Sequence, residues 1–406
     1  MEKESEINSV ILSNSLENLA ERMINALYFP DLMQRPFEKR LVVVPDMAMK
    51  EFLVGYCVSH PRLRVCAGLQ IQLLNDATTQ LRGPSGKKVP SAAVLSLAIE
   101  EALWARGVED SALRKYLSNG SEEKKGRRIA QLSDELARLF SLYGLHGVHF
   151  LKGWLSPKEK HWQKKLFCEL FHPNSPWSYP IELYRGKMEC AARIALFGFH
   201  YLSAVHLSFF TQRGASIYAL SPSMVFWGDF VTDKEKIAER RRLMRKGASA
   251  QKIEVIQRYF EEGHPLLNNW GKLGREMLKN LDAFAFVEEE AYDFREVAKP
   301  TLLGGLKRSL LLLEQGSLTA DDSLQIHSAT SKLREVEAMF LTLEKLLATH
   351  AENEDPLRLR DVLIYAPDIA VYAPYIAMVL SQRGCPYSIH GLPLSVTSSA
   401  VRGFLL

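Results

Sequence analysis

The sequence predicts an α/β fold built on parallel β-strands. Two runs of apolar residues, at 10–12 and 41–44, each lead into a segment in which apolar residues recur with helical spacing. Two further runs, at 194–197 and 216–220, flank an apolar helix at 202–210. Strands that alternate with helices form parallel sheets, and four apolar residues in a row suit a strand buried on both faces. We therefore expect these four strands in one sheet.

The turns after the first two strands contain residues that begin helices. Ser13-Asn14-Ser15 supplies an N-cap after the first strand, and Pro45-Asp46 ends the second strand before the next helix. A long stretch before the third strand shows amphipathic helical spacing. We expect residues 80–190 to form a helical insertion in the sheet domain, and residues 232–315 to form a charged helical segment.

A second series of strands and helices is expected near the end of the sequence. Apolar runs at 324–327, 362–365 and 387–389 alternate with helical patterns, which predicts a second parallel sheet. This divides the sequence into a first domain over 1–320 and the start of a second domain over 321–406. The last residues are apolar and resemble the start of a helix, so we expect a piece of a longer protein.

Composition is that of an ordinary globular protein. The chain has 406 residues, of which 47% are hydrophobic, and a net charge of +4. Its five cysteines are odd in number and lack CxxC spacing, which argues against a disulfide framework and for a reducing compartment. No apolar run approaches the roughly 18 residues that a membrane span needs, and no signal peptide is visible. These features predict a cytoplasmic protein without a membrane partner.

The sequence lacks a phosphate-binding loop. A Walker A motif, GxxxxGK[ST], should follow the first strand of a nucleotide-hydrolysing domain, but Ser13-Asn14-Ser15-Leu16 stands there without Gly or Lys. The segment Gly83–Lys88 has a Gly-Lys pair without the remaining motif residues, and it is typical of a surface turn. We expect no ATP hydrolysis and no cofactor in this chain.

Metal and nuclease patterns are equally weak. His146 with His149, and Cys168 with His172, could each supply two ligands, but no second pair lies near either in the sequence. The acidic clusters at 288–290 and 321–322 do not follow hydrophobic strands, which favours solvated loops or helix ends. The sequence therefore predicts no metal site and no catalytic residues.

Positive charge concentrates between Lys234 and Lys252. If this segment is helical, Arg241 and Arg245 stack one turn apart and could neutralise successive phosphates of a nucleic acid. The alternative is a solvated helix face. The candidate DNA-binding residues of this segment are Arg240, Arg241, Arg242, Arg245, Lys246 and Lys252.

Two other groups extend the candidate DNA-binding set. A second basic patch consists of Lys124, Lys125, Arg127 and Arg128. A Trp in the loop at 226–230 could stack on a base or fill a junction, and a Gly-containing segment at 265–277 carries further cations. The candidates from these two segments are Trp227, Lys272 and Arg275.

The same segments resemble a known family. The chain is similar to the N-terminal part of the exodeoxyribonuclease V gamma chains, the RecC subunits of RecBCD helicase–nucleases. The FWGDF and PLLNNWGKLGREM motifs are the most specific matches, and the helical stretch matches only loosely. The matching segments are 13–16, 36–53, 226–230, 265–277, 333–347 and 361–376.

This resemblance implies a fold and a function. The fold would be similar to superfamily-one helicases, with P-loop-type parallel sheets that lack a Walker A motif and a large helical insertion. The function would be that of a non-catalytic subunit in double-strand-break repair and recombination. It would bind single-stranded and forked DNA beside RecB-like and RecD-like subunits in a heterotrimer. Those partners would use ATP and Mg²⁺ for helicase and exonuclease activity.

The resemblance also implies a way to read a signal in the DNA. RecC-like proteins scan the 3′-ended strand for the Chi sequence, and the positions in this chain that correspond to Chi-reading residues are Pro45, Met47, Glu51, Arg138 and Ser141. These residue types depart from the family, so a different signal, or none, is expected. Two other functions stay open: an autonomous ATP-dependent helicase with an atypical phosphate loop, and a scaffold that binds only proteins.

Overall fold

The chain divides into two compact units. The computed structural model describes residues 9–28, 38–63, 68–82, 87–106, 111–118, 121–154, 161–184, 193–247, 249, 251, 263–283, 294–295, 300–314, 319–353 and 356–392. The first unit comprises residues 1–298 and 306–316, and the second comprises residues 299–305 and 317–406.

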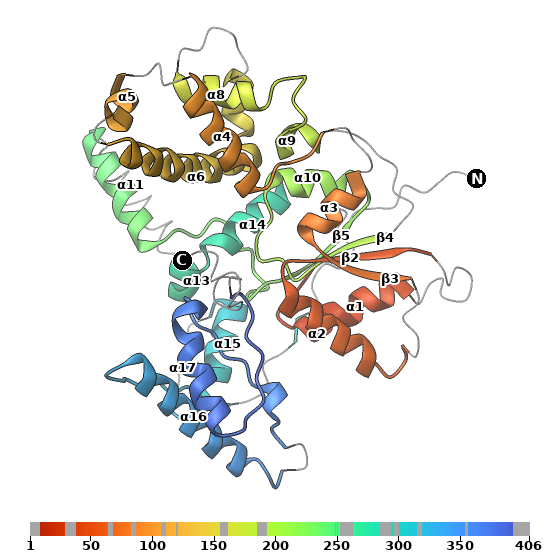
Figure 1. Cartoon of the computed structure of the whole chain (residues 1–406). Coiled ribbons are helices and arrows are strands. Elements are labelled where there is room, and N and C mark those ends of the chain that lie inside the picture. Colours follow the sequence, from red (N-terminus) through yellow and green to blue (C-terminus); the bar gives the residue numbers. More distant parts are fainter. Residues whose placement is uncertain are drawn as a thin grey trace, which may run out of the picture. The chain divides into compact units, whose positions relative to one another are not determined.

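A five-stranded parallel sheet forms the centre of the first unit (Figure 1). Its strand order is β1-β5-β4-β2-β3, and every neighbouring pair is parallel. The strands are β1 (Val10–Ser13), β2 (Arg40–Val44), β3 (Leu69–Leu73), β4 (Arg193–Phe197) and β5 (Ser216–Leu220). All five residues of β2 are buried, as expected of a central strand whose two faces are both covered.

The four strands expected from apolar runs are confirmed, and one strand was not predicted. β3 reads Leu-Gln-Ile-Gln-Leu and lies at an edge of the sheet beside β2. Its residues alternate between apolar and polar, and none of them is fully buried. This alternation is typical of a half-exposed strand and is the signal that could have identified it.

Helices cover both faces of the sheet. The side chains of Val42 and Val44 pack in one core with α1 (Leu16–Tyr28) and α2 (Met47–Ser59). Leu41 and Val43 point the other way, because successive side chains of a strand alternate between the two faces. They join a core to which three helices contribute: α3 (Leu74–Arg82), α10 (Ala204–Thr211) and α14 (Lys272–Asp282).

The chain between α3 and β4 folds into a helical bundle with its own core. Phe140 and Phe167 are fully buried there, with ring centroids 5.3 Å apart in an edge-to-face arrangement. α6 is the longest helix of this bundle and packs along α4. The bundle consists of α4 (Ala92–Arg106), α5 (Ser111–Ser118), α6 (Glu122–His146), α7 (Val148–Trp154), α8 (Trp162–Leu170) and α9 (Pro180–Leu183).

The second unit is built on two packed helices. α16 (Lys332–Thr349) and α17 (Ile369–Gln382) bury a small core that includes Phe340 and Ile376. A short 3₁₀ helix, η1 (Leu359–Asp361), precedes the chain that leads to α17. α15 (Leu302–Leu312) contributes its first residues to this unit and its remainder to the first unit.

The prediction of a second parallel sheet is wrong for the described residues. The segments 324–327, 362–365 and 387–389 form no strand there. An apolar run becomes a strand only when a neighbour satisfies its backbone groups, and none of these segments pairs with another. In the middle segment Ile364 packs against the helix pair, whereas Tyr365 is 86% exposed.

His206 provides a pH-dependent contribution to the stability of the first unit. Its ring is buried at the start of α10, where Nδ1 lies 3.0 Å from Oγ of Ser203. Burial, with a smaller contribution from the positive charge that His146 can carry, lowers the pKa of His206 to about 4. The folded protein therefore keeps this imidazole neutral under conditions in which the unfolded chain protonates it.

We expect the free energy of unfolding to fall by about 3 kcal/mol as the pH decreases from 6.5 to 4 because of this residue. Below a pH of about 4, His206 is protonated in both the folded and the unfolded protein. It therefore causes no further decrease in the free energy of unfolding. Urea unfolding at several pH values would measure the effect. His206→Gln should remove this part of the pH dependence, and an unchanged profile in that variant would assign the effect to other groups.

Candidate nucleic-acid interface

The turn after β1 is hydrogen-bonded to a distant segment of the same chain. The Asn14 side chain donates from Nδ2 to the carbonyl oxygen of Arg295 at 2.9 Å, and its Oδ1 accepts from the backbone N–H of Arg295 at 2.9 Å. Ser13 and Ser15 close the same turn, because Oγ of Ser13 accepts from the Ser15 N–H at 3.1 Å. A phosphate-binding loop would place backbone amides and a Lys after this strand. In this chain the same position holds hydrogen bonds between a side chain and the backbone.

α11 (Asp233–Arg245) is a helix that buries none of its residues. It begins with a capping box, in which Oγ1 of Thr232 accepts from the Glu235 N–H and the Glu235 carboxylate accepts from the Thr232 N–H. A short helix normally needs a packed apolar face to be stable, and a helix that is polar all round implies another role. α11 therefore does not contribute to the core of the unit.

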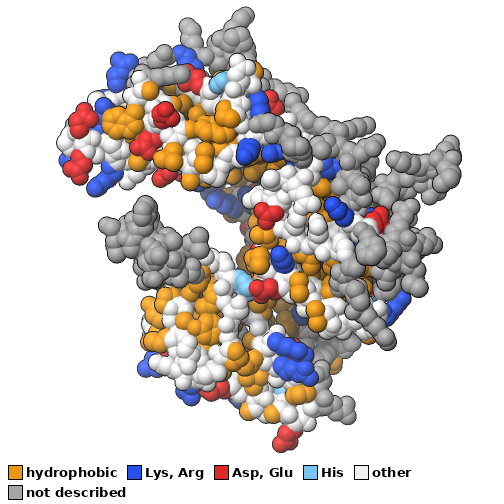
Figure 2. Space-filling model, turned by 45° about the vertical axis from the view of Figure 1, so that its right-hand side comes forward, with side chains coloured by type: hydrophobic (Ala, Val, Ile, Leu, Met, Phe, Trp, Pro, Cys, Tyr) orange, Lys and Arg blue, Asp and Glu red, His pale blue; other side chains and the backbone are white. Residues whose placement is uncertain are grey.

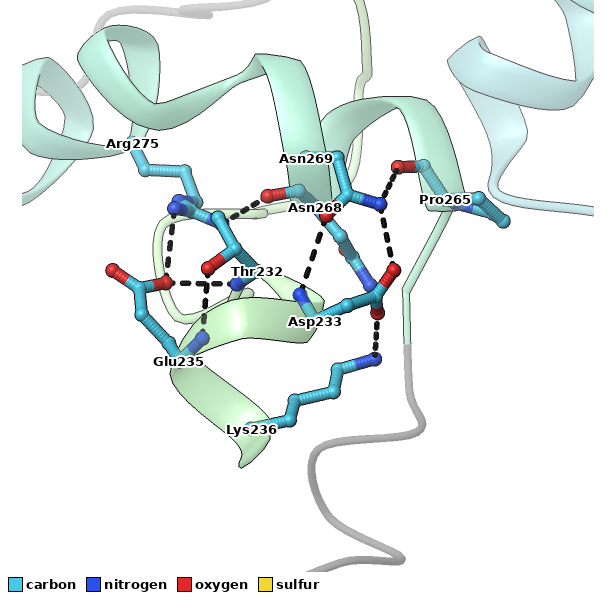
Figure 3. Close-up of polar contacts among 8 residues, drawn as sticks. All are labelled: Thr232, Asp233, Glu235, Lys236, Pro265, Asn268, Asn269 and Arg275. Atoms are coloured by element: carbon cyan, nitrogen blue, oxygen red, sulfur yellow. Dashed lines mark hydrogen bonds and ion pairs between the residues drawn. The ribbon is translucent and has the colours of Figure 1, made fainter. Parts of the chain in front are cut away.

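The start of α11 is fixed to the corner between α13 (Pro265–Trp270) and α14 (Figure 3). Asn269 donates from Nδ2 to the Asp233 carboxylate at 2.9 Å and accepts from the Asp233 N–H at 3.2 Å. The hydrogen bond from Asn269, with the Lys236 ammonium 3.5 Å away, holds the pKa of Asp233 below its usual value. Glu235 lies 3.4 Å from the Arg275 guanidinium, which adds a second link. The helix is thus anchored at one end.

The exposed cations of α11, apart from Arg240, lie on one side of the helix. At 3.6 residues per turn, Arg241 and Arg245 lie above one another, and Arg240 points to the opposite side of the helix. We call the first side the cationic face of α11; it consists of Lys234, Arg241, Arg242, Arg245 and, at the C-cap, Lys246. Arg242 also forms an ion pair with Glu239 at 3.1 Å. The face is a row of positive charge suited to a phosphate backbone.

Trp227 and Arg275 are structural residues. The Trp227 ring is buried and donates from Nε1 to Ser221 Oγ at 3.2 Å. A Cβ added at Gly274 would come within 2.5 Å of this ring, so glycine is required for the close approach. Arg275 is also buried and donates to the Asn268 carbonyl oxygen at 2.8 Å. We therefore leave both residues out of the interface.

The neighbouring Trp270 was not selected from the sequence, although it is 82% exposed. It ends α13 beside the exposed Lys272, close in sequence to the Asn269 that holds α11. A tryptophan with its ring in solvent is available to stack on a base. The two glycines at 271 and 274 allow a close approach, and it is the ring of Trp227, not that of Trp270, that lies against them.

The second basic patch lies at the start of α6. Ser121 is the N-cap, and the patch residues lie in the first two turns of the helix. Lys125 extends over the Trp104 ring, with Nζ 5.0 Å from its centroid, and Arg128 lies over the Tyr116 ring at 5.3 Å. The first and third cations of the patch, Lys124 and Arg127, are exposed. The second and fourth cations, Lys125 and Arg128, are each paired with an aromatic ring.

The predicted signal-reading positions lie on two elements. Pro45 and Met47 follow the carboxyl end of β2, and Glu51 is exposed on α2. The α6 positions are engaged within their own helix: Arg138 bonds Glu135 at 2.6 Å, and Ser141 Oγ donates to the Ala137 carbonyl oxygen at 2.8 Å.

Other features of the described residues place limits on the site. Lys252 lies outside the described residues. Within the described part of the chain, no three His, Cys, Asp or Glu side chains gather as ligands of a metal ion would. No described helix has both the length and the apolar character to cross a membrane.

The fold and its surface define an α/β protein with two exposed basic helical segments and a blocked strand tip. The chain belongs to the family of RecC N-terminal domains, which matches residues 9–313. Among its relatives, the RecBCD enzyme subunit RecC of Haemophilus influenzae (strain ATCC 51907 / DSM 11121 / KW20 / Rd) is 23% identical over 485 residues. That alignment covers 98% of this chain and 42% of the relative.

A second relative has the same description. The RecBCD enzyme subunit RecC of Escherichia coli (strain K12) is 25% identical over 315 residues, which cover 63% of this chain and 27% of the relative. The chain thus spans less than half the length of the two relatives. The prediction of a RecC-like N-terminal part is confirmed, and the likeness to superfamily-one helicases stays a prediction.

Proposed function

We propose that this chain is the N-terminal, DNA-binding part of a non-catalytic RecC-type subunit that acts in DNA repair and recombination. The observation that carries the proposal is α11, a helix that buries no residue and turns a row of cations to solvent, in a chain of the RecC N-terminal family. Its role is to hold the phosphates of single-stranded and forked DNA. RecB-like and RecD-like subunits are its partners in a cytoplasmic heterotrimer.

The turn after β1 supports a non-catalytic role. Asn14 uses both ends of its amide on the Arg295 backbone, at the position where a phosphate-binding loop would have to leave its amides available. ATP and Mg²⁺ would then be used by the partner subunits. If a Chi-like signal is read, the residues proposed to contact it are Pro45, Met47, Glu51, Arg138 and Ser141.

We expect the purified chain to bind a labelled forked oligonucleotide with an affinity that falls steeply with salt. Five cations on one face that contact single-stranded phosphates would give a slope of log affinity against log salt of about −3.5. Fluorescence anisotropy at several salt concentrations would measure it. A chain that captures a RecB-like subunit but binds no DNA would contradict the proposal in favour of a scaffold. ATP hydrolysis by the chain alone would contradict it in favour of a helicase.

A further inference from the structure

We infer that Trp104 and Tyr116 form a base-stacking site for single-stranded DNA at the start of α6. The inference rests on the proposed function and adds to it a second site, separate from α11, with its own chemistry. Figure 2 shows hydrophobic side chains exposed on the helical bundle at the top of the view, with Lys and Arg side chains nearby. The aromatic residues concerned are large, accessible and each paired with a cation.

Trp104 lies on the surface between α4 and α6. It is 45% exposed, and the Lys125 ammonium lies 5.0 Å from its ring centroid. A Cβ at Gly126 would lie 3.8 Å from Cζ2 of the ring, so the indole rests against the backbone of α6. The preceding residue, Leu103, is buried in the core of the bundle. The core is therefore filled by the neighbouring side chain, and the tryptophan remains at the surface.

Tyr116 repeats this arrangement on α5. It is 48% exposed, while the following residue, Leu117, is buried in the same core. The Arg128 guanidinium lies 5.3 Å from the Tyr116 ring centroid and donates to the Tyr116 carbonyl oxygen at 2.8 Å. One arginine thus contacts both the backbone and the ring of Tyr116, which stays about half exposed. A ring held in this way loses little conformational freedom when a base stacks on it.

The two sites follow each other along α6. Lys125 and Arg128 are three residues apart on the helix, so their Cβ atoms are neighbours at about 5–6 Å. Trp104 and Tyr116 therefore contact adjacent turns of the same side of α6. This arrangement offers two rings in succession to the bases of one strand.

The local charge favours a nucleic acid. The segment Arg114–Arg128 carries six cations and two carboxylates, Glu122 and Glu123, which gives it a net charge equal to that of the whole chain. The carboxylates occupy the first turn of α6, where negative charge stabilises a helix. Base faces are available for stacking only in an unpaired strand, and a duplex presents its phosphates instead. Aromatic rings among cations therefore fit single-stranded DNA better than a duplex.

The test compares stacking variants with a matched control on the same helix face. Trp104→Ala and Tyr116→Ala should each weaken binding of the chain to oligothymidine by about 5- to 100-fold. Leu97→Ala removes an apolar side chain that is 67% exposed on α4, two turns from Trp104, and should leave binding unchanged. Affinity for a blunt duplex should change by less than about two-fold in all three variants, and the salt slope should stay constant, because stacking releases no counterions.

Two further measurements separate the possible failures. Trp104→Leu keeps the apolar contact with α6 but has no aromatic face, so it should bind oligothymidine as weakly as the alanine variant. Trp104→Phe should restore part of the affinity. If the double variant Trp104→Leu/Tyr116→Leu binds oligothymidine as tightly as the unmodified chain, the stacking site is overturned and the proposed function stands. If the unmodified chain binds no DNA, both fail. Equal losses on single strand and duplex would also overturn the stacking site.

Discussion

Replacing Arg241 and Arg245 by glutamate lowers the affinity for single-stranded DNA by about 100-fold or more at moderate salt. Both residues lie on the cationic face of α11, one turn apart, and neither supports the core, because α11 buries no residue. Charge reversal removes two phosphate contacts and places two carboxylates against the same phosphates. The slope of log affinity against log salt should become shallower by about 1.4 for a single strand.

Arg240→Glu is the matched control for this pair. Arg240 is adjacent in sequence and exposed, yet helical geometry places it on the opposite side of α11. The charge of the chain changes in the same way, so any loss that comes only from net charge would also appear in this variant. Circular dichroism would check that the helix persists in both proteins. If Arg240→Glu weakens binding as much as Arg241→Glu alone, a defined cationic face is refuted.

Arg40→Ala lowers the free energy of unfolding by about 3–5 kcal/mol. Arg40 is 0% exposed at the start of β2, and its guanidinium donates from Nε to the Leu27 carbonyl oxygen at 2.7 Å and from Nη1 to that of Glu38 at 2.9 Å. It also lies over the Tyr28 ring, 4.8 Å from the centroid. Alanine leaves these carbonyl groups without their donors and opens a cavity beneath the strand.

Urea unfolding followed by circular dichroism would measure this loss. Arg193→Ala is a suitable comparison, because Arg193, on the neighbouring strand, lies 3.7 Å from the side-chain carboxylate of Glu38 but is partly exposed. Water can replace its contacts, so its loss should be clearly smaller. Equal effects of the two substitutions would show that the buried hydrogen bonds of Arg40 contribute little.

Contiguous apolar runs were sufficient to predict four of the five strands of the main sheet, but they failed in the second unit. A run such as that of β2 is apolar because helices cover both of its faces. The segment 362–365 has a similar composition, yet it lies along the α16–α17 pair without a strand beside it. Strand formation depends on a partner that local sequence does not specify.

The candidate interface was predictable in charge but not in its aromatic residues. The cationic face of α11 follows from residue spacing alone. Residue spacing does not predict which tryptophan is exposed. Trp227 and Trp270 occur in similar sequence surroundings, and only Trp227 is enclosed by the glycines at the start of α14. Trp104 and Tyr116 were not predicted either. The cations that accompany them come from a different helix, and contacts between helices are decided by tertiary packing.

The position of β1 has a consequence for synthesis of the protein. Among the described strands β1 pairs only with β5, and Oγ of Ser9 bonds Oγ of Ser216, 207 residues later. At about 5–20 residues per second, a ribosome needs roughly 10–40 s to deliver that partner after β1 has been made. During this delay the apolar residues of β1 have no partner strand on the nascent chain. The brevity of β1, only four residues, limits what it can wrongly associate with in the meantime.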